Sequence, residues 1–217
     1  MTNGAVDSHF LRDQVTVMTQ WDANEVPTER ARVYGSLLAA VRDFLDQLSD
    51  ASPDVGVGQR IEADIRKHTR ILAKTQATST DIAERQLLPG RGLLMLPPFV
   101  VSRRDTRSVS GKVVFGRHFR GGSGAVHGGI VALLFDEVLG VLVNSTARPT
   151  SPTARLAVDF RSITPVEEEL DVTGWYGKEA GRKRILKGEI RCRGVLCAEA
   201  EGLFVESRAN QPHSKSS

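Results

Sequence analysis

Residues 121–140 read GGSGAVHGGIVALLFDEVLG, and this stretch decides the fold. A glycine-rich loop leads into an apolar segment whose only charged side chains are Asp136 and Glu137. A helix that is apolar on all sides belongs in a protein interior, where a carboxylate is costly unless it is paired or functional. We therefore predict a buried helix over about 128–144 that carries a paired or functional carboxylate.

The glycines indicate what this helix does. They let a ligand approach the backbone at a helix N-terminus, where unpaired N–H groups and the helix dipole favour negative charge. Donors that polarise a carbonyl, followed two turns later by the carboxylate of Asp136, fit an attack on a carbonyl carbon. Glu137 lies about 100° further round the helix, so we interpret it as a salt-bridge residue rather than a second catalytic acid.

Strand-like patterns surround the predicted helix. We expect strands over Val109–Phe119, Arg155–Arg161 and about 168–178, 183–192 and 195–206, with turns at Glu179–Gly181 and Arg193-Gly194. In the last strand small residues alternate with glutamates, so a helix can lie close against the sheet. One buried helix among antiparallel strands predicts an α+β fold in which the sheet curls around a central helix.

The first part of the chain has a helical pattern instead. Apolar spacing predicts one helix from Thr28 to about Leu48 and a second over about Gln59–Ala77. Residues 80–98 are interrupted by Gly and Pro and are typical of an irregular, packed connection. The expected organisation is an N-terminal helical extension and linker over 1–95, an α+β domain over 96–207 and a disordered tail over 208–217.

Composition narrows the function classes. Lys and Arg number 29 and Asp and Glu 26, a net charge of +3, which together with an aromatic content of 6% gives no indication of a nucleic-acid partner. Cys192 and Cys197 lack a metal-ligand spacing, and the turn between them disfavours a disulfide, so we expect free thiols in a reducing cytoplasm. The sequence shows no signal peptide and no membrane span.

Three blocks of sequence together resemble the hotdog-fold thioesterases, in particular the PaaI-like acyl-CoA thioesterases, over about 96–206. These blocks are His127-Gly128-Gly129 with Asp136 nine positions after the histidine, then Thr153–Arg161, then Gly181–Arg184 with the closing strand Ala198–Phe204. The resemblance implies a hotdog fold, with an antiparallel sheet wrapped around the long helix. It also implies a homodimer or a dimer of dimers (a homotetramer) with the active site at the dimer interface.

The resemblance assigns catalytic roles to four residues. Asp136 is the carboxylate, either as the general base for water or as the nucleophile, and the Gly128 N–H binds the thioester oxygen. His127 either staples the loop or contacts the substrate directly; we leave these two alternatives equal. Thr153 is expected to serve the site from the partner subunit, although a threonine in a strand is also unremarkable.

Further residues are candidates for substrate binding. Gly129 belongs to the same loop, and Ser123 is the nearest polar substitute for an asparagine that often stands where this sequence has Gly121. The basic run Arg182, Lys183 and Arg184 reads either as a solvated loop or as a site for coenzyme A phosphates. The apolar run Leu93–Leu96 reads as a core seam, with an acyl pocket as the alternative.

The sequence thus predicts an acyl-CoA thioesterase that releases a free acid and coenzyme A. Coenzyme A enters only as part of the substrate, and no metal or other cofactor is expected. Three alternatives remain: a non-catalytic acyl-CoA-binding or regulatory hotdog module, a hydratase acting on enoyl thioesters, and a protein-interaction arm over 29–79.

Overall fold

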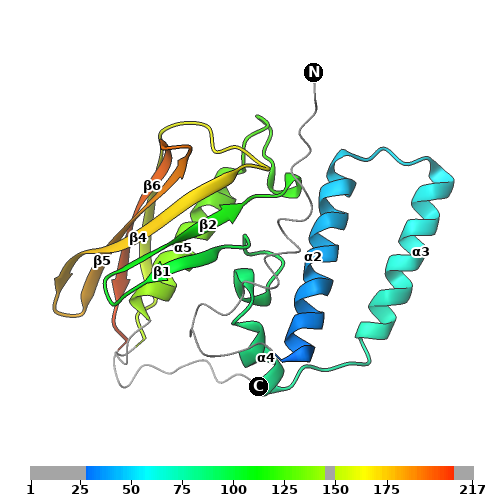
Figure 1. The fold of residues 1–217 in the computed structure, drawn as a ribbon, viewed down its shortest axis with the longest axis horizontal. Helices are drawn as coiled ribbons and strands as arrows, with labels where there is room; N and C mark the ends of the chain where they lie inside the picture. The colour runs from blue at the N-terminus through cyan, green and yellow to red at the C-terminus, as the bar shows by residue number, and fades with distance from the viewer. Residues whose placement is uncertain (1–27, 145–149, 208–217) are drawn as a thin grey trace. The chain divides into compact units, whose positions relative to one another are not determined.

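The computed structural model describes residues 28–144 and 150–207. These residues form two compact units, which are described separately (Figure 1). The first comprises the residues up to Leu94 together with Gly116–His118, and the second comprises Met95–Phe115 and the residues from Phe119 onward. The predicted tail over 208–217 lies outside the described residues, and the predicted domain boundaries stay a prediction.

The first unit is helical. It contains α2 (Glu29–Asp50), α3 (Val55–Leu72), α4 (Ser79–Arg85) and the 3₁₀ turn η1 (Pro89–Gly92). Side chains of Thr28 and Asp54 accept hydrogen bonds from the first turns of α2 and α3, which explains where these helices start. The predicted helices are present, the second of them beginning and ending a few residues earlier than predicted.

Helix α4 is not predicted by the sequence analysis, which treats residues 80–98 as an irregular connection. It is started by a reciprocal pair of hydrogen bonds between Thr78 and Asp81, in which each side chain accepts from the other residue's backbone N–H. This capping box is readable in the sequence as Thr-x-x-Asp, so the signal was present. Seven residues are too few for an apolar period to reveal the helix.

One face of α2 packs within this unit. Leu38 lies in a small apolar cluster with Leu88, against which Tyr34 and Leu94 pack. The guanidinium of Arg42 is buried and donates to the carbonyl of Leu93 over 3.2 Å. The run Leu93–Leu96 therefore divides, because Leu94 joins this cluster and Leu96 is buried in the second unit, whereas Leu93 and Met95 are exposed.

The short segment Gly116–His118 completes the first unit. The carboxylate of Asp46 accepts hydrogen bonds from the backbone N–H and the ring of His118, and a Cβ on Gly116 would lie 2.5 Å from that carboxylate. Burial alone would raise the pKa of Asp46, but these hydrogen bonds hold the pKa below its ordinary value. This contact corrects the predicted strand over Val109–Phe119, which ends at Val114 because the chain turns to meet Asp46.

The second unit is the predicted α+β fold, in the hotdog arrangement. Its six strands are β1 (Val100–Arg104), β2 (Ser108–Val114), β3 (Thr153–Phe160), β4 (Glu169–Ala180), β5 (Lys183–Cys192) and β6 (Val195–Val205). Every neighbouring pair is antiparallel, and the order across the sheet is β1-β2-β4-β5-β6-β3, so β3 is an edge strand. Helix α5 (Gly128–Val143) contacts β2, β3, β4, β5 and β6 (Figure 1).

The predicted turns also form. Positive φ angles at Gly181 (+55°), Arg193 (+49°) and Gly194 (+82°) reverse the chain between consecutive strands. Cys192 and Cys197, on either side of the second turn, are free thiols as predicted, and burial raises the pKa of the Cys192 thiol.

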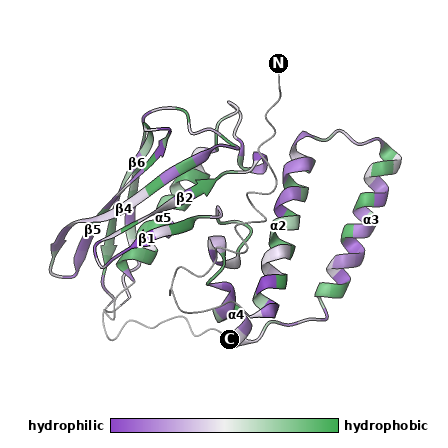
Figure 2. Ribbon diagram, in the orientation of Figure 1, coloured by the Kyte–Doolittle hydropathy of each residue, from purple (hydrophilic) through white to green (hydrophobic). Residues whose placement is uncertain are grey.

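Helix α5 lies close to the sheet because three strands present glycine beneath it. A Cβ on Gly188 would lie 3.0 Å from Phe135, one on Gly174 3.0 Å from Leu139, and one on Gly202 3.3 Å from Leu139. Gly174 and Gly188 are paired across β4 and β5. Figure 2 shows the apolar character of α5, whose buried side chains fill the space above these glycines. Gly174, Gly188 and Gly202 therefore form a notch in the sheet, in which α5 lies.

This notch predicts a stability difference between two Gly→Ala substitutions. Gly188→Ala should lower the free energy of unfolding by about 1–3 kcal/mol, because the added methyl group overpacks the core against Phe135. Gly140→Ala, on α5 with no atom within 4 Å of the new methyl group, should raise it by up to about 1 kcal/mol through helix propensity. Urea unfolding measures both, and equal effects would contradict the notch.

Candidate active site

The glycine-rich loop before α5 is held by its own backbone. The N–H of Gly121 donates to the carbonyl of Ala125 over 2.7 Å, and the N–H of Gly124 donates back to Gly121 over 3.2 Å. Gly124 has a φ of +80°, which glycine adopts readily. Ser123 lies exposed at the tip of this turn, so the predicted polar substitute faces solvent in the single chain.

His127 is the N-cap of α5. Its Nδ1 accepts a hydrogen bond from the N–H of Gly129 over 3.0 Å, and its own N–H donates to the carbonyl of Phe119 over 2.8 Å. Because Nδ1 accepts, the proton of the neutral ring is assigned to Nε2. Of the two alternatives left by the sequence, this geometry supports the structural one, in which His127 holds the loop in place. It also gives the N–H of Gly129 a structural hydrogen bond.

Gly128 is the first residue of α5, and its backbone N–H donates no hydrogen bond to any other described residue. This is expected of the first turn of a helix, whose N–H groups point out of its end. A Cβ on Gly128 would lie 3.1 Å from the ring of Phe160, so a side chain here would be crowded. Within the described part of the chain, the Gly128 N–H is therefore an unused hydrogen-bond donor that lies beside the ring of Phe160.

Phe160 was not singled out as a site residue from the sequence. The signal was its place in β3, where alternation puts it on the same face as Leu156 and Val158, two residues that are partly buried. Phe160 itself is 56% exposed, because it lies at the end of the strand, where its ring meets the start of α5 instead of the core.

Asp136 lies on the second turn beyond the glycines and is half-buried. The hydroxyl of Thr153, the first residue of β3, donates to Asp136 Oδ1 over 2.7 Å. The structure therefore joins the two predicted residues within one chain. A role of Thr153 in the site of a partner subunit stays a prediction. Glu137 is also half-buried, one helical step round from Asp136.

Helical geometry separates the two halves of the predicted site. Eight residues along an α-helix place Asp136 about 12 Å from Gly128. A thioester carbonyl cannot accept from the Gly128 N–H and be attacked beside Asp136 across that distance. Within a single chain, therefore, the Gly128 N–H and Asp136 cannot both act on one carbonyl, which agrees with the expected site at a dimer interface.

The basic run divides into three different environments. Arg184 is 3% exposed, and it donates to the hydroxyl of Ser151 over 2.5 Å and to the carboxylate of Glu206 over 2.6 Å. Arg182 is exposed but donates twice to the backbone carbonyl of Glu206. Lys183 is exposed. Because Arg184 is committed to an internal network, we leave it out of any phosphate site.

Metal binding and membrane crossing were the two other properties that the described residues could indicate. Within residues 28–144 and 150–207, no group of three or more His, Cys, Asp or Glu side chains could hold a metal ion. Over the same ranges, no helix has both the length and the apolar character needed to cross a membrane.

Residues 123–196 match the family model of the thioesterase superfamily. The matched segment contains His127, Gly128, Asp136 and Thr153, so it spans the candidate site. The predicted resemblance to hotdog thioesterases is thus confirmed at the level of the superfamily and of the fold.

One solved structure supports this match. A thioesterase superfamily protein named RHA08564 is 28% identical with a TM-score of 0.69, and the likeness covers 83% of this chain and 92% of that one. Two more distant likenesses are a hypothetical thioesterase from Streptococcus pneumoniae solved with coenzyme A (16% identity, TM-score 0.47, 50% and 88% coverage) and thioesterase superfamily member 2 from Mus musculus (15%, 0.46, 49% and 80%). No curated protein sequence matches the chain.

The N-cap bond of His127 predicts a separation of stability from activity. His127→Ala should lower the free energy of unfolding by about 1 kcal/mol, because the first turn of α5 loses its side-chain acceptor. His127→Ser keeps a capping oxygen and should recover most of that loss. Thermal unfolding and a thioester hydrolysis assay on both variants provide the measurement. Loss of hydrolysis in both variants without any loss of stability would instead favour direct substrate contact.

Proposed function

We propose that this protein is an acyl-CoA thioesterase of the PaaI-like group, which hydrolyses its substrate to a free acid and coenzyme A. The observation that carries the proposal is the hydrogen bond from Thr153 to Asp136 Oδ1. It orients a carboxylate that stands on an apolar helix, inside a segment that matches the thioesterase superfamily. A fold that needed only a core would place an apolar residue at this position.

The active site is built from two chains. One chain supplies Asp136 with Thr153, and a second chain supplies the Gly128 N–H, because the two groups of one helix are about 12 Å apart. The protein is accordingly a homodimer at least. The edge strand β3 carries Thr153 at one end and Phe160 at the other, so it borders both halves of the site.

The reaction follows from these groups. The thioester oxygen accepts the Gly128 N–H at the positive end of the α5 dipole, where charge develops as the carbonyl carbon is attacked. Water attacks that carbon while Asp136 takes its proton; the C–S bond then breaks, and the sulfur leaves as the thiol with the proton that Asp136 returns. In the nucleophilic variant Asp136 attacks the carbon first and expels the coenzyme A thiolate, and water then hydrolyses the resulting anhydride. Thr153 holds one carboxylate oxygen, which leaves the other to act.

Coenzyme A takes part only as the leaving half of the substrate. Its phosphates would meet exposed cations, of which Lys183 and Arg182 remain available at the turn between β4 and β5. A contact of this kind binds ground and transition states equally and would act on KM. Ser123 and Gly129 remain candidates for contact with the substrate at the loop.

The assignment of the carboxylate predicts a contrast between neighbours. Asp136→Asn should keep the hydrogen bond acceptor for Thr153 but lower kcat by about 10²–10⁴, the usual effect of losing a positioned acid or base. Glu137→Gln should keep most of the activity. Hydrolysis of a panel of aliphatic and aromatic acyl-CoA substrates, with binding measured separately by calorimetry, provides the test.

The same panel separates the proposal from its main alternative. A wild-type protein that binds acyl-CoA but hydrolyses none of the panel would be a binding module and would refute the proposal. An inactive Glu137→Gln beside an active Asp136→Asn would show that the wrong carboxylate has been assigned.

A further inference from the structure

Helix α3 is a long helix without a buried side chain. It has 18 residues, none of them buried among the described residues. Helices in folded proteins draw most of their stability from packing an apolar face rather than from intrinsic propensity. Ile65 is 46% exposed, and Ile71 and Leu72 are more than half exposed. The apolar face of α3 therefore has the composition of a packed helix without the burial.

Helix α2 shows the same feature on its second face. Its buried residues are centred on Leu38, whereas Val33, Leu37, Phe44 and Leu48 are 64%, 43%, 36% and 48% exposed. At 100° per residue these four fall within about 60° of one another, roughly 140° from the centre of the buried face. Helix α2 is thus apolar on two sides, and the described residues of its unit cover only one of them.

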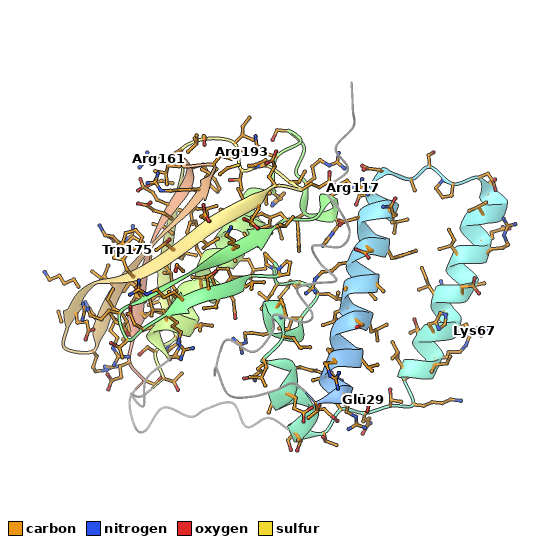
Figure 3. All side chains as sticks on the ribbon, viewed as in Figure 1. Glu29, Lys67, Arg117, Arg161, Trp175 and Arg193 are labelled. Atoms are coloured by element: carbon orange, nitrogen blue, oxygen red, sulfur yellow. The ribbon has the colours of Figure 1, made fainter. Side chains whose placement is uncertain are left out.

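The two exposed faces line one groove. Phe44 and Leu48 from α2 and Ile61 and Ile65 from α3 line an open groove of about 610 Å³ between the helices. In Figure 3 side chains from α2 and α3 project toward one another across this space, whereas the labelled Lys67 points away from it. The groove lies wholly within the first unit.

Charge along the hairpin indicates what fills the groove. Residues 43–64, around the connection between α2 and α3, carry six carboxylates and one arginine. Residues 65–74, at the opposite end of α3, carry four Lys and Arg and no carboxylate. Asp46 and Asp50 are partly neutralised by His118 and Arg117, but the imbalance between the two ends persists. The hairpin is acidic at its connection and basic at its open end.

We propose that this groove is an interface with a second copy of the chain, in which two α2–α3 hairpins pack about a two-fold axis into a four-helix bundle. An antiparallel arrangement places the acidic end of each hairpin over the basic end of the other. It also covers Phe44, Leu48 and Ile65 with their counterparts, as an isologous interface requires. The groove belongs to the first unit, whereas the β3 edge, Asp136 and Gly128 belong to the second.

The test compares two matched Ile→Glu variants of the full chain. Ile65→Glu places a charge in the groove, whereas Ile82→Glu places one on α4, at a position of nearly equal exposure (52%) outside the groove lining. Ile65→Glu should halve the particle mass measured by light scattering or sedimentation at micromolar concentration, and Ile82→Glu should leave it unchanged. Hydrolysis of acyl-CoA should be the same in both variants.

A charge variant provides a second measurement that spares the apolar face. Arg70→Glu with Lys74→Glu leaves two cations and two carboxylates over residues 65–74 and so removes the net positive charge of the open end. Self-association should then weaken about tenfold or more at low salt and recover toward wild type at high salt, as surface charges are screened. Circular dichroism of each variant confirms that α3 still folds. A particle mass that Ile65→Glu does not change would overturn the proposal, and another partner would then have to cover the groove. A mass halved together with lost hydrolysis would place the groove in the active assembly and overturn its separation from the site.

Discussion

The close contact between α5 and the sheet is the constraint on which the rest of the second unit depends. Gly174, Gly188 and Gly202 leave room for Phe135 and Leu139 to lie against the strands. The side of α5 that faces the sheet is buried and apolar, so its polar groups lie at its N-terminal end and along its half-buried side. The free N–H of Gly128 and the carboxylate of Asp136 occupy these two places. Packing thus decides where the chemistry can be.

Helix α5 also keeps the Gly128 N–H and the Asp136 carboxylate apart. Two turns of helix put about 12 Å between the donor and the acid, and no local adjustment can close that distance. In the site that we propose, a single chain therefore holds two half-sites, one made of Gly128 beside Phe160 and the other made of Asp136 with Thr153. If one half comes from each of two chains, as we propose, assembly is a requirement for catalysis.

Much of this could be predicted from the sequence, because the deciding signals are local. The apolar run of α5, the strand alternation and the turns at Gly181 and Gly194 each depend on neighbouring residues. The part played by Arg184 could not be predicted, because its partners Ser151 and Glu206 are 33 and 22 residues away. The pairing of Thr153 with Asp136 of its own chain also depends on how the edge strand meets the helix, which no periodicity reports.

In the α2–α3 hairpin, too, the sequence predicts the helices but not their packing. Its spacing correctly indicated two amphipathic helices, but an apolar stripe does not say what covers it. In α2 the buried face is centred on Leu38, while Phe44 and Leu48 lie exposed in a groove that no described part of the first unit fills. Sequence periodicity indicates that an apolar face is to be covered. Only the structure shows which apolar face of α2 is buried and which one is left exposed.

Mixing two inactive variants tests the central claim, a site shared between chains, most directly. Asp136→Asn removes the acid, and Gly128→Pro removes the N–H at a first helical position whose backbone suits proline. The ring of Phe160, which a Cβ at position 128 would approach to 3.1 Å, is 56% exposed and can shift to accept it. After the two proteins are unfolded together and refolded, half of the dimers are mixed, and each mixed dimer holds one intact site. The account predicts recovery of about a quarter of wild-type activity per chain from two inactive parents. A mixture as inactive as its parents, although mixed dimers form, would show that each site is built from a single chain.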